Sequence, residues 1–307
     1  MLRSACVAAA LLSAAPALAD PFSFVALGDM PYGAPKKVWP RYEVLIDRIN
    51  AAAPALVVHV GDTKSGSTEC DDGMLDQQLA YLNSFAAPTL YSPGDNEWTD
   101  CHRKKAGRFD PLERLARIRA TYFNAPETSF GQTRVAVTSQ AGKGYPENAR
   151  LMHEGVMFVT AHVVGSNNNF EIRDPAAVAE FFARDKATTK WLDQSFDAAK
   201  DAEALVLAIH ADMFEFDYRP GKESWLRHSG FLNFGPMLQA KAVEFGKPVL
   251  LIFGDSHVHR VFRPFPKTAP NVTALEVFGA DDMHAVEVFV DPARPAPFGF
   301  RPLLNAD

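Results

Sequence analysis

Short apolar runs alternate along the chain with segments whose apolar residues recur at every third or fourth position. A near-continuous apolar run is typical of a strand in a sheet that is covered on both faces. The recurring pattern is typical of a helix that packs one face against such a sheet. The predicted strands cover residues 22–27, 54–60, 88–93, 149–154, 156–164, 204–210, 248–254, 273–279 and 284–290. The predicted helices cover residues 42–52, 74–85, 110–123, 176–200 and 231–246.

The order of these segments, strand then helix over most of the chain, predicts the α/β fold class. No internal repeat and no clear domain boundary interrupt the pattern, and residues 20–307 are expected to form a single domain. Residues from about 100 to 150 have the pattern of an insertion, which contains the helix predicted at 110–123. The proline-rich stretch 291–302 is expected to lie over the surface as a C-terminal tail.

The first 19 residues have the composition of a secretory signal peptide. Arg3 gives a positive start, residues 5–15 are apolar but too few to span a bilayer, and Ala17-Leu18-Ala19 forms a small-residue cleavage site before Asp20. No later stretch is long and apolar enough for a membrane helix, and we expect an exported protein without a membrane anchor. The alanine-rich signal is typical of bacteria, which indicates the periplasm.

Charge and cysteine content narrow the function further. The chain carries a formal net charge of -6 and has no run of lysine and arginine that would indicate nucleic-acid binding. Cys6 would leave with the signal peptide, and Cys70 and Cys101 would remain in an oxidising compartment. We therefore predict a disulfide between them, and closing a loop of about 30 residues contributes roughly 3–4 kcal/mol of stability.

Acidic, amide and imidazole side chains stand where the predicted strands end. In an open α/β sheet, ligands bind at the carboxyl ends of the strands, where glycine lets the backbone turn sharply. Five separate segments can therefore deliver polar side chains to one place. These side chains are Asp29, Asp62, Asp95 with Asn96, His210, and Asp255 with His257 and His259.

The mixture of side chains points to a metal site, because carboxylate, amide oxygen and imidazole are ligands of zinc, manganese and iron. Converging carboxylates without a cation would repel one another and raise each other's pKa. We expect one or two ions, and a pair of ions clamps both the attacking and the leaving oxygen of a displacement. In a continuing strand, residues 255, 257 and 259 would share one side. The predicted ligands are Asp29, Asp62, Asp95 or Asn96, His210, His257, and one of Asp255 or His259.

The order and spacing of these motifs resemble those of the calcineurin-like metallophosphoesterase family, over residues from about 22 to 262. The family motifs are Asp-x-His, Gly-Asp-x-x-Asp, Gly-Asn-His-Glu or Asp, a lone His, and Gly-His-x-His. Asp29 matches the first Asp, Asp62 the bridging Asp, and His210 the lone His. The resemblance implies two packed mixed β-sheets flanked by helices, a four-layer sandwich, in which a metal-activated water attacks phosphorus.

The first two motifs depart from the family pattern. Pro31 stands where the first motif has its histidine. Purple acid phosphatases of the same superfamily also lack this histidine and have a tyrosine ligand in the second motif. This chain has Ser65 at the position of that tyrosine, and Tyr32 is the tyrosine nearby.

The third and fifth motifs can each be aligned in two ways. Alignment of the third motif on Gly94 and Glu97 puts Asp95 at the asparagine ligand and Asn96 at the histidine that protonates the leaving group. Alternatively, Asn96 is itself the ligand through its amide oxygen. In the fifth motif, the two histidine positions fall on residues 255 and 257 or on residues 257 and 259.

An asparagine cannot act as the general acid, and this role passes to another residue. The candidates are His102, just past the third motif, and His162, near the end of the strand predicted at 156–164. Residues 165–170 are predicted as a turn, and alternatively their backbone amides contact substrate oxygens.

The sequence therefore predicts an exported metal-dependent phosphoesterase that hydrolyses small phosphomonoesters or phosphodiesters. The alternative is a binding protein that has kept the fold and lost catalysis, which Pro31 and Asn96 favour. A serine esterase with Gly-Asp-Ser near the N-terminus is disfavoured, because Met30 stands at the serine position and a thioether cannot be the nucleophile.

Overall fold

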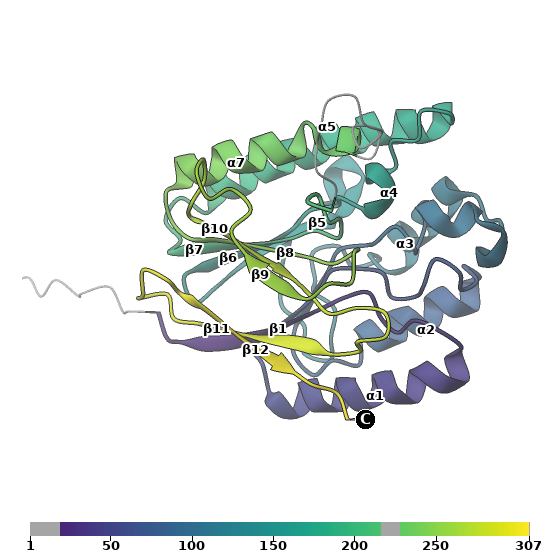
Figure 1. Cartoon of the computed structure of the whole chain (residues 1–307), viewed down its shortest axis with the longest axis horizontal. Helices are drawn as coiled ribbons and strands as arrows, with labels where there is room; N and C mark the ends of the chain where they lie inside the picture. The colour runs from purple at the N-terminus through teal and green to yellow at the C-terminus, as the bar shows by residue number, and fades with distance from the viewer. Residues whose placement is uncertain (1–18, 216–227, 307) are drawn as a thin grey trace, which may run out of the picture.

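The computed structural model describes residues 19–215 and 228–306, and residues 1–18 of the predicted signal peptide lie outside the described residues. Two β-sheets pack face to face in this part of the chain (Figure 1). The five-stranded sheet contains, in spatial order, β12 Phe298–Leu303, β11 Ala285–Val290, β1 Phe22–Leu27, β2 Leu56–His59 and β3 Thr89–Tyr91. The seven-stranded sheet contains β4 Thr138–Gln140, β5 Tyr145–His153, β6 Val156–Thr160, β7 Ala204–Ala208, β8 Val249–Phe253, β10 Val272–Glu276 and β9 Arg260–Phe262.

Both sheets are mixed, with parallel strands at their centres. β1, β2 and β3 run parallel, whereas β11 is antiparallel to both β1 and β12. β6, β7, β8 and β10 also run parallel, and β4, β5 and β9 add antiparallel pairs at the two edges. The carboxyl ends of the parallel strands are where ligands bind in sheets of this kind.

Helices cover the outer face of each sheet (Figure 1). The helices α1 (Pro35–Ala52) and α2 (Asp72–Leu82) lie along the five-stranded sheet, and α5 (Pro175–Ala198) and α7 (Phe234–Phe245) lie along the seven-stranded sheet. The predicted fold class, two packed mixed sheets flanked by helices, is therefore confirmed. None of the described helices is long and apolar enough to cross a membrane. The remaining helical segments are α3 Pro111–Thr121, α4 Gly165–Asn168, and the 3₁₀ turns η1 Thr99–His102, η2 Lys104–Ala106, η3 Ala141–Lys143 and η4 Ser229–Phe231.

An apolar core fills the space between the two sheets. Phe24 and Val58 of the five-stranded sheet pack there with Phe158 and Ile252 of the seven-stranded sheet. Separate cores lie between each sheet and its helices. The central strands are therefore buried on both faces, which explains why their sequences are near-continuous apolar runs.

The chain after β8 does not continue as a strand. β8 ends at Phe253, and the next strand, β9, begins at Arg260. Asp255 and His257 have φ angles of 78° and 62°, which lie in the left-handed region and not in the strand region. The expectation that residues 255, 257 and 259 share one side of a strand is therefore wrong.

The C-terminal stretch is more ordered than the proline content indicates. Residues 298–303 form β12, which pairs antiparallel with β11 at the edge of the five-stranded sheet. Phe298 and Phe300 pack against the core between the sheets, while Gly299 and Arg301 are exposed. This alternation is typical of an edge strand with one buried face, and Pro302 is tolerated there because an edge strand need not donate on both sides.

Candidate metal centre

Four carboxylates and one imidazole lie together where strands of both sheets end. Ligand atoms of Asp29, Asp62 and His210 lie within 4.8 Å of one another, and the same holds for ligand atoms of Asp95, His210 and Asp255. His210 belongs to both groups and therefore connects them. We call these five residues the carboxylate centre.

Parallel strands from both sheets supply the carboxylate centre. Asp29, Asp62 and Asp95 follow β1, β2 and β3 of the five-stranded sheet, and His210 and Asp255 follow β7 and β8 of the seven-stranded sheet. Parallel neighbours end at the same edge of their sheet, and packing the sheets face to face brings the two edges together. The structure thus brings five of the predicted ligands together from distant parts of the chain.

The two ring nitrogens of the fully buried His210 have different partners. Nδ1 lies 2.9 Å from the carbonyl oxygen of Val60 and donates to it. Nε2 lies 3.0 Å from Asp95 Oδ1 and 3.4 Å from Asp62 Oδ1, and an ionised carboxylate has no proton to donate. A metal ion, or a proton on the imidazole or on a carboxylate, is therefore needed between Nε2 and these oxygens. A backbone carbonyl on the other nitrogen is the usual partner of a metal-binding histidine.

Burial and mutual repulsion shift the pKa values at the centre. Burial raises the pKa of Asp29 to about 7 and raises the pKa values of Asp62 and Asp255 well above their usual range. Burial alone would lower the pKa of His210, but the charge of Asp62 and the hydrogen bond to Asp95 outweigh burial and raise it. Burial alone would raise the pKa of Asp95, but the hydrogen bond and charge of His210, the hydrogen bond from Ser166 and the charge of Arg103 together outweigh burial and lower it.

These shifts show what balances the charge when no metal is bound. A proton on His210 then pairs with Asp95, and protons on the other carboxylates relieve their repulsion. Bound metal would replace these protons and balance the negative charge of the carboxylates. The donor set, with its carbonyl-bound imidazole, therefore fits a metal ion such as zinc, manganese or iron.

Glycines at the strand ends allow the loops of the centre to approach closely. A Cβ atom on Gly254 would lie 1.9 Å from Asp29 Oδ2, and one on Gly94 would lie 2.1 Å from Asp62 Oδ1. Neither distance is compatible with a side chain, so each glycine makes room for a carboxylate from the loop after another strand. The Gly-Asp pattern therefore reflects contact between loops as well as a sharp turn.

Tyr32 and Asn96 border the centre on the side of Asp62. The Tyr32 phenol and the Asn96 side-chain amide both donate to Asp62 Oδ2, and the amide also donates to the phenol oxygen at 2.8 Å. Asp95 lies against His210, while Asn96 contacts Asp62 through hydrogen bonds. Of the two candidates from the third motif, the structure therefore brings Asp95, and not Asn96, into the carboxylate centre. The tyrosine at the centre comes from the loop after β1.

Two residues of the fifth motif lie at the metal centre: Asp255 belongs to the carboxylate centre, and His257 lies beside Asp29. His257 is partly exposed, and its Nε2 lies 3.6 Å from Asp29 Oδ1. His259 instead stacks on Phe278 at a centroid distance of 4.0 Å, and its Nδ1 donates to the carbonyl oxygen of Glu276. The structure does not bring His259 into either group of the carboxylate centre, because the left-handed residues before it turn the chain.

Neither histidine predicted as the general acid lies among the carboxylates. His102 lies in η1, and its Nδ1 is 2.6 Å from the carbonyl oxygen of Thr99. His162 is fully buried beside Trp98, and its Nδ1 donates to Glu147 Oε1 at 2.8 Å. Burial lowers the pKa of His162 to about 4. Each imidazole is held by a local partner, and the structure therefore supports neither prediction.

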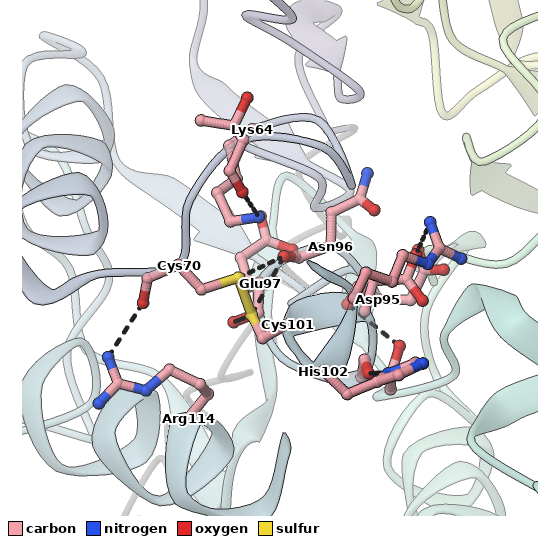
Figure 2. Close-up of a disulfide and its surroundings, with 12 residues drawn as sticks. Lys64, Cys70, Asp95, Asn96, Glu97, Cys101, His102 and Arg114 are labelled. Carbon is pink, nitrogen blue, oxygen red and sulfur yellow. Dashed lines mark hydrogen bonds and ion pairs between the residues drawn. A yellow bond between two sulfur atoms is a disulfide. The ribbon is translucent and has the colours of Figure 1, made fainter. Parts of the chain in front are cut away.

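Two links hold the loops after β2 and β3 together (Figure 2). The Cys70–Cys101 disulfide joins them, which confirms the predicted pairing. The fully buried Glu97 accepts hydrogen bonds from the backbone N–H groups of Asp62 at 3.2 Å and Gly94 at 2.9 Å. Glu97 aligns with the last residue, Glu or Asp, of the third family motif. The sequence did not indicate that Glu97 holds two loops together, because this role depends on contacts between separate loops.

A cavity of about 700 Å³ opens beside the carboxylate centre, and Asp255 lies in its wall. Arg103 and Arg173 line it together with the apolar side chains of Phe170 and Ile172. A cavity of this size accommodates a small organic molecule. The centre is therefore accessible to a substrate from this side.

No protein-family model and no curated protein matches the chain. Among solved structures, it is similar to GAP50 of Plasmodium, described as the anchor in the inner membrane complex, with a TM-score of 0.50 and 10% identity over 94% of this chain and 90% of that chain. For TT1561 of Thermus thermophilus, the TM-score is 0.46 and the identity 11%, over 92% of this chain and 98% of that chain. For the purple acid phosphatase PPD1 of yellow lupin seeds, the TM-score is 0.49 and the identity 10%, over 94% of this chain and 54% of that chain.

The likeness to GAP50 covers nearly all of both chains, and at 10% identity it shows a shared fold alone. The two packed mixed sheets that the resemblance to calcineurin-like metallophosphoesterases implied are confirmed as the fold. What the carboxylate centre does must be argued from its own residues.

Proposed function

We propose that this chain is an exported, metal-dependent phosphoesterase that hydrolyses small phosphomonoesters or phosphodiesters. The observation that carries the proposal is the position of His210. Its Nε2 faces the carboxylates of Asp62 and Asp95, while a backbone carbonyl holds Nδ1. The buried Cys70–Cys101 disulfide supports export, and the signal-like residues 1–19 favour the periplasm.

The carboxylate centre has enough donors for two ions. Nε2 of His210 offers one lone pair and binds one ion, which Asp95 and Asp255 would share with it. Asp29 and His257 would hold the other ion, and Asp62 would lie between the two. A metal bound here would lower the pKa of a water molecule and stabilise negative charge on phosphoryl oxygens.

Tyr32 and Asn96 would orient Asp62 and offer hydrogen-bond donors beside it. The amide of Asn96 is not an acid, and burial, together with the charge of Asp62, raises the pKa of Tyr32 well above its usual range, which makes its phenol a weak acid. A positioned general acid contributes roughly 10²–10⁴-fold to a rate. We therefore expect the protein to prefer esters with good leaving groups.

Hydrolysis of p-nitrophenyl phosphate and bis(p-nitrophenyl) phosphate tests the proposal, with zinc, manganese or iron supplied to metal-free protein. Both substrates have a good leaving group, and we expect turnover that chelators abolish. Asp62→Asn should lower kcat/KM by more than about 100-fold, because even outer partners of metal ligands are worth about 10–100-fold. The exposed Asp201→Asn is the matched control and should retain full activity.

The second candidate is a binding protein that has kept the fold. Pro31 and Asn96, which replace two family histidines, favour it, and GAP50 shows that a protein of this fold is described as an anchor. A binding protein would show no metal-dependent turnover for Asp62→Asn to remove. Absence of turnover with every supplied metal, in a folded protein, would therefore decide for this candidate.

A further inference from the structure

Four consecutive residues beside the carboxylate centre have a left-handed backbone. Ser166, Asn167, Asn168 and Asn169 have φ angles of 52°, 55°, 57° and 59°. Left-handed residues other than glycine are uncommon and normally occur singly. We call residues 166–169 the left-handed turn.

Side-chain hydrogen bonds hold the left-handed turn in place. Asn167 Oδ1 accepts from the backbone N–H of Gly230 at 2.8 Å. Asn168 Oδ1 accepts from Nη1 of the fully buried Arg184 at 2.6 Å, and its carbonyl oxygen accepts from Nη2 at 2.8 Å. Asn169 donates to a carboxylate of α5 at 2.8 Å. The surrounding structure therefore fixes this conformation firmly.

The asparagines suit the left-handed turn, but Ser166 does not. Asparagine tolerates a left-handed backbone because its short amide side chain can bond locally, whereas serine has no such advantage. Glycine would meet the conformational demand of position 166 with less strain. The hydroxyl of Ser166 must therefore explain the residue type.

That hydroxyl contacts a proposed metal ligand. Ser166 Oγ lies 2.8 Å from Asp95 Oδ2 and 3.1 Å from Asp100 Oδ1, and the shorter distance identifies Asp95 as the acceptor of its proton. The other oxygen, Asp95 Oδ1, faces His210 Nε2 at 3.0 Å. With Oδ2 occupied, the carboxylate cannot rotate without breaking a hydrogen bond.

We propose that Ser166 is a positioning residue of the metal centre, which fixes Asp95 so that Oδ1 points to the ion bound by His210. The left-handed turn holds the hydroxyl at the place where this contact forms. The inference rests on the proposed function, because it needs a metal at the carboxylate centre. Ser166 would support a ligand without binding the metal itself. The sequence placed Ser166 in a predicted turn and indicated no role for its hydroxyl.

The inference is tested by measuring the zinc affinity of wild type, Ser166→Gly and Ser166→Ala. Each metal-free protein is titrated with zinc in competition with a fluorescent zinc chelator. Both variants lose the hydroxyl, and we expect each to bind the zinc of the Asp95 site about 10-fold more weakly, the lower range for outer partners of metal ligands. Ser166→Gly should unfold at the same temperature as metal-free wild type or higher, because glycine relieves the backbone. A purely structural role would not combine unchanged stability with weaker zinc binding.

Ser229→Ala is the matched control, since Ser229 contacts Asn167 of the same turn, at 3.1 Å, instead of Asp95. Its zinc affinity should stay within about two-fold of wild type. Wild-type zinc affinity in both Ser166 variants would overturn the inference and leave the proposed function intact. A wild-type protein that binds no zinc, manganese or iron would overturn both.

Discussion

At the scale of single residues, the carboxylate centre depends on glycines, which have no side chain, as much as on its carboxylates and imidazole. Gly254 and Gly94 leave space that Asp29 and Asp62 occupy. The four carboxylates come from loops of separate strands and approach closely because these positions carry no Cβ. The centre is therefore sensitive to small additions of volume that leave every ligand in place.

Gly254→Ala tests this dependence. The added methyl would meet Asp29 Oδ2 at 1.9 Å, and we expect the free energy of unfolding to fall by roughly 3 kcal/mol, the upper end of the usual cost of overpacking. Gly235→Ala in α7 is the matched control, because a Cβ there meets nothing within 4 Å. The control should be neutral or stabilise by roughly 0.5–1 kcal/mol. Equal urea midpoints for the two metal-free variants would contradict this account.

The sequence predicted which residue types would meet but left neighbouring residues unresolved. Asp95 and Asn96 are adjacent, and Asp255 and His259 belong to one loop, so spacing could not choose within either pair. The choice depends on local backbone angles. Asp255 and His257 are left-handed, which no alternating pattern of apolar and polar residues reveals.

At the scale of elements, the loops after β2 and β3 act as one unit. The disulfide covalently joins Cys70 to Cys101 across 31 positions, and the hydrogen bond from the backbone N–H of Asp62 to Glu97 joins the same two loops. Asp62 lies on the first of these loops and Asp95 on the second. A disulfide and a buried hydrogen bond therefore both fix the position of Asp62 relative to Asp95.

Replacing both cysteines by alanine should therefore lower stability. Loss of a disulfide across a loop of this length costs roughly 3–4 kcal/mol in the chain-entropy model, and urea denaturation measures this difference. A reducing agent should bring wild type close to the double variant and leave the variant itself unchanged. A double variant as stable as oxidised wild type would show that the disulfide adds nothing to the hydrogen bonds of Glu97.

Strands buried on both faces could be predicted from the sequence, and the edge strands β9 and β12 could not. The apolar runs of β1, β2, β7 and β8 mark strands of the sheet centres. The edge strands β9 and β12 are short or rich in exposed residues, and β12 contains proline. Their pairing is decided by the neighbouring strand, which a local pattern does not show.

At the scale of the whole molecule, the decisive feature is that two sheets end at one place. The consecutive strands β10 and β11 belong to different sheets, and nothing in the chain pattern indicates this division. The resemblance of the motifs to metallophosphoesterases implied two sheets, but not which strands belong to each. Packing the sheets face to face then joins three strand ends of one sheet to two of the other.

This convergence makes metal binding compete with protons. Burial raises the pKa of Asp29 to about 7, and the carboxylates raise the pKa of His210 despite its burial. Below pH 7 the metal-free centre therefore keeps protons that a metal must displace, and affinity for metal should rise with pH. Metal should stabilise the fold more at pH 8 than at pH 5, because fewer protons have to leave.

The number of metal ions bound per chain tests the central claim most directly. The mature protein, purified without a histidine tag and supplied with zinc, manganese or iron, is measured by elemental analysis at pH 8 and at pH 5. We expect two ions per chain at pH 8 and fewer at pH 5. A folded protein that retains no metal at pH 8 would contradict the account, because the carboxylate centre would then exist without the ions for which its donors are arranged.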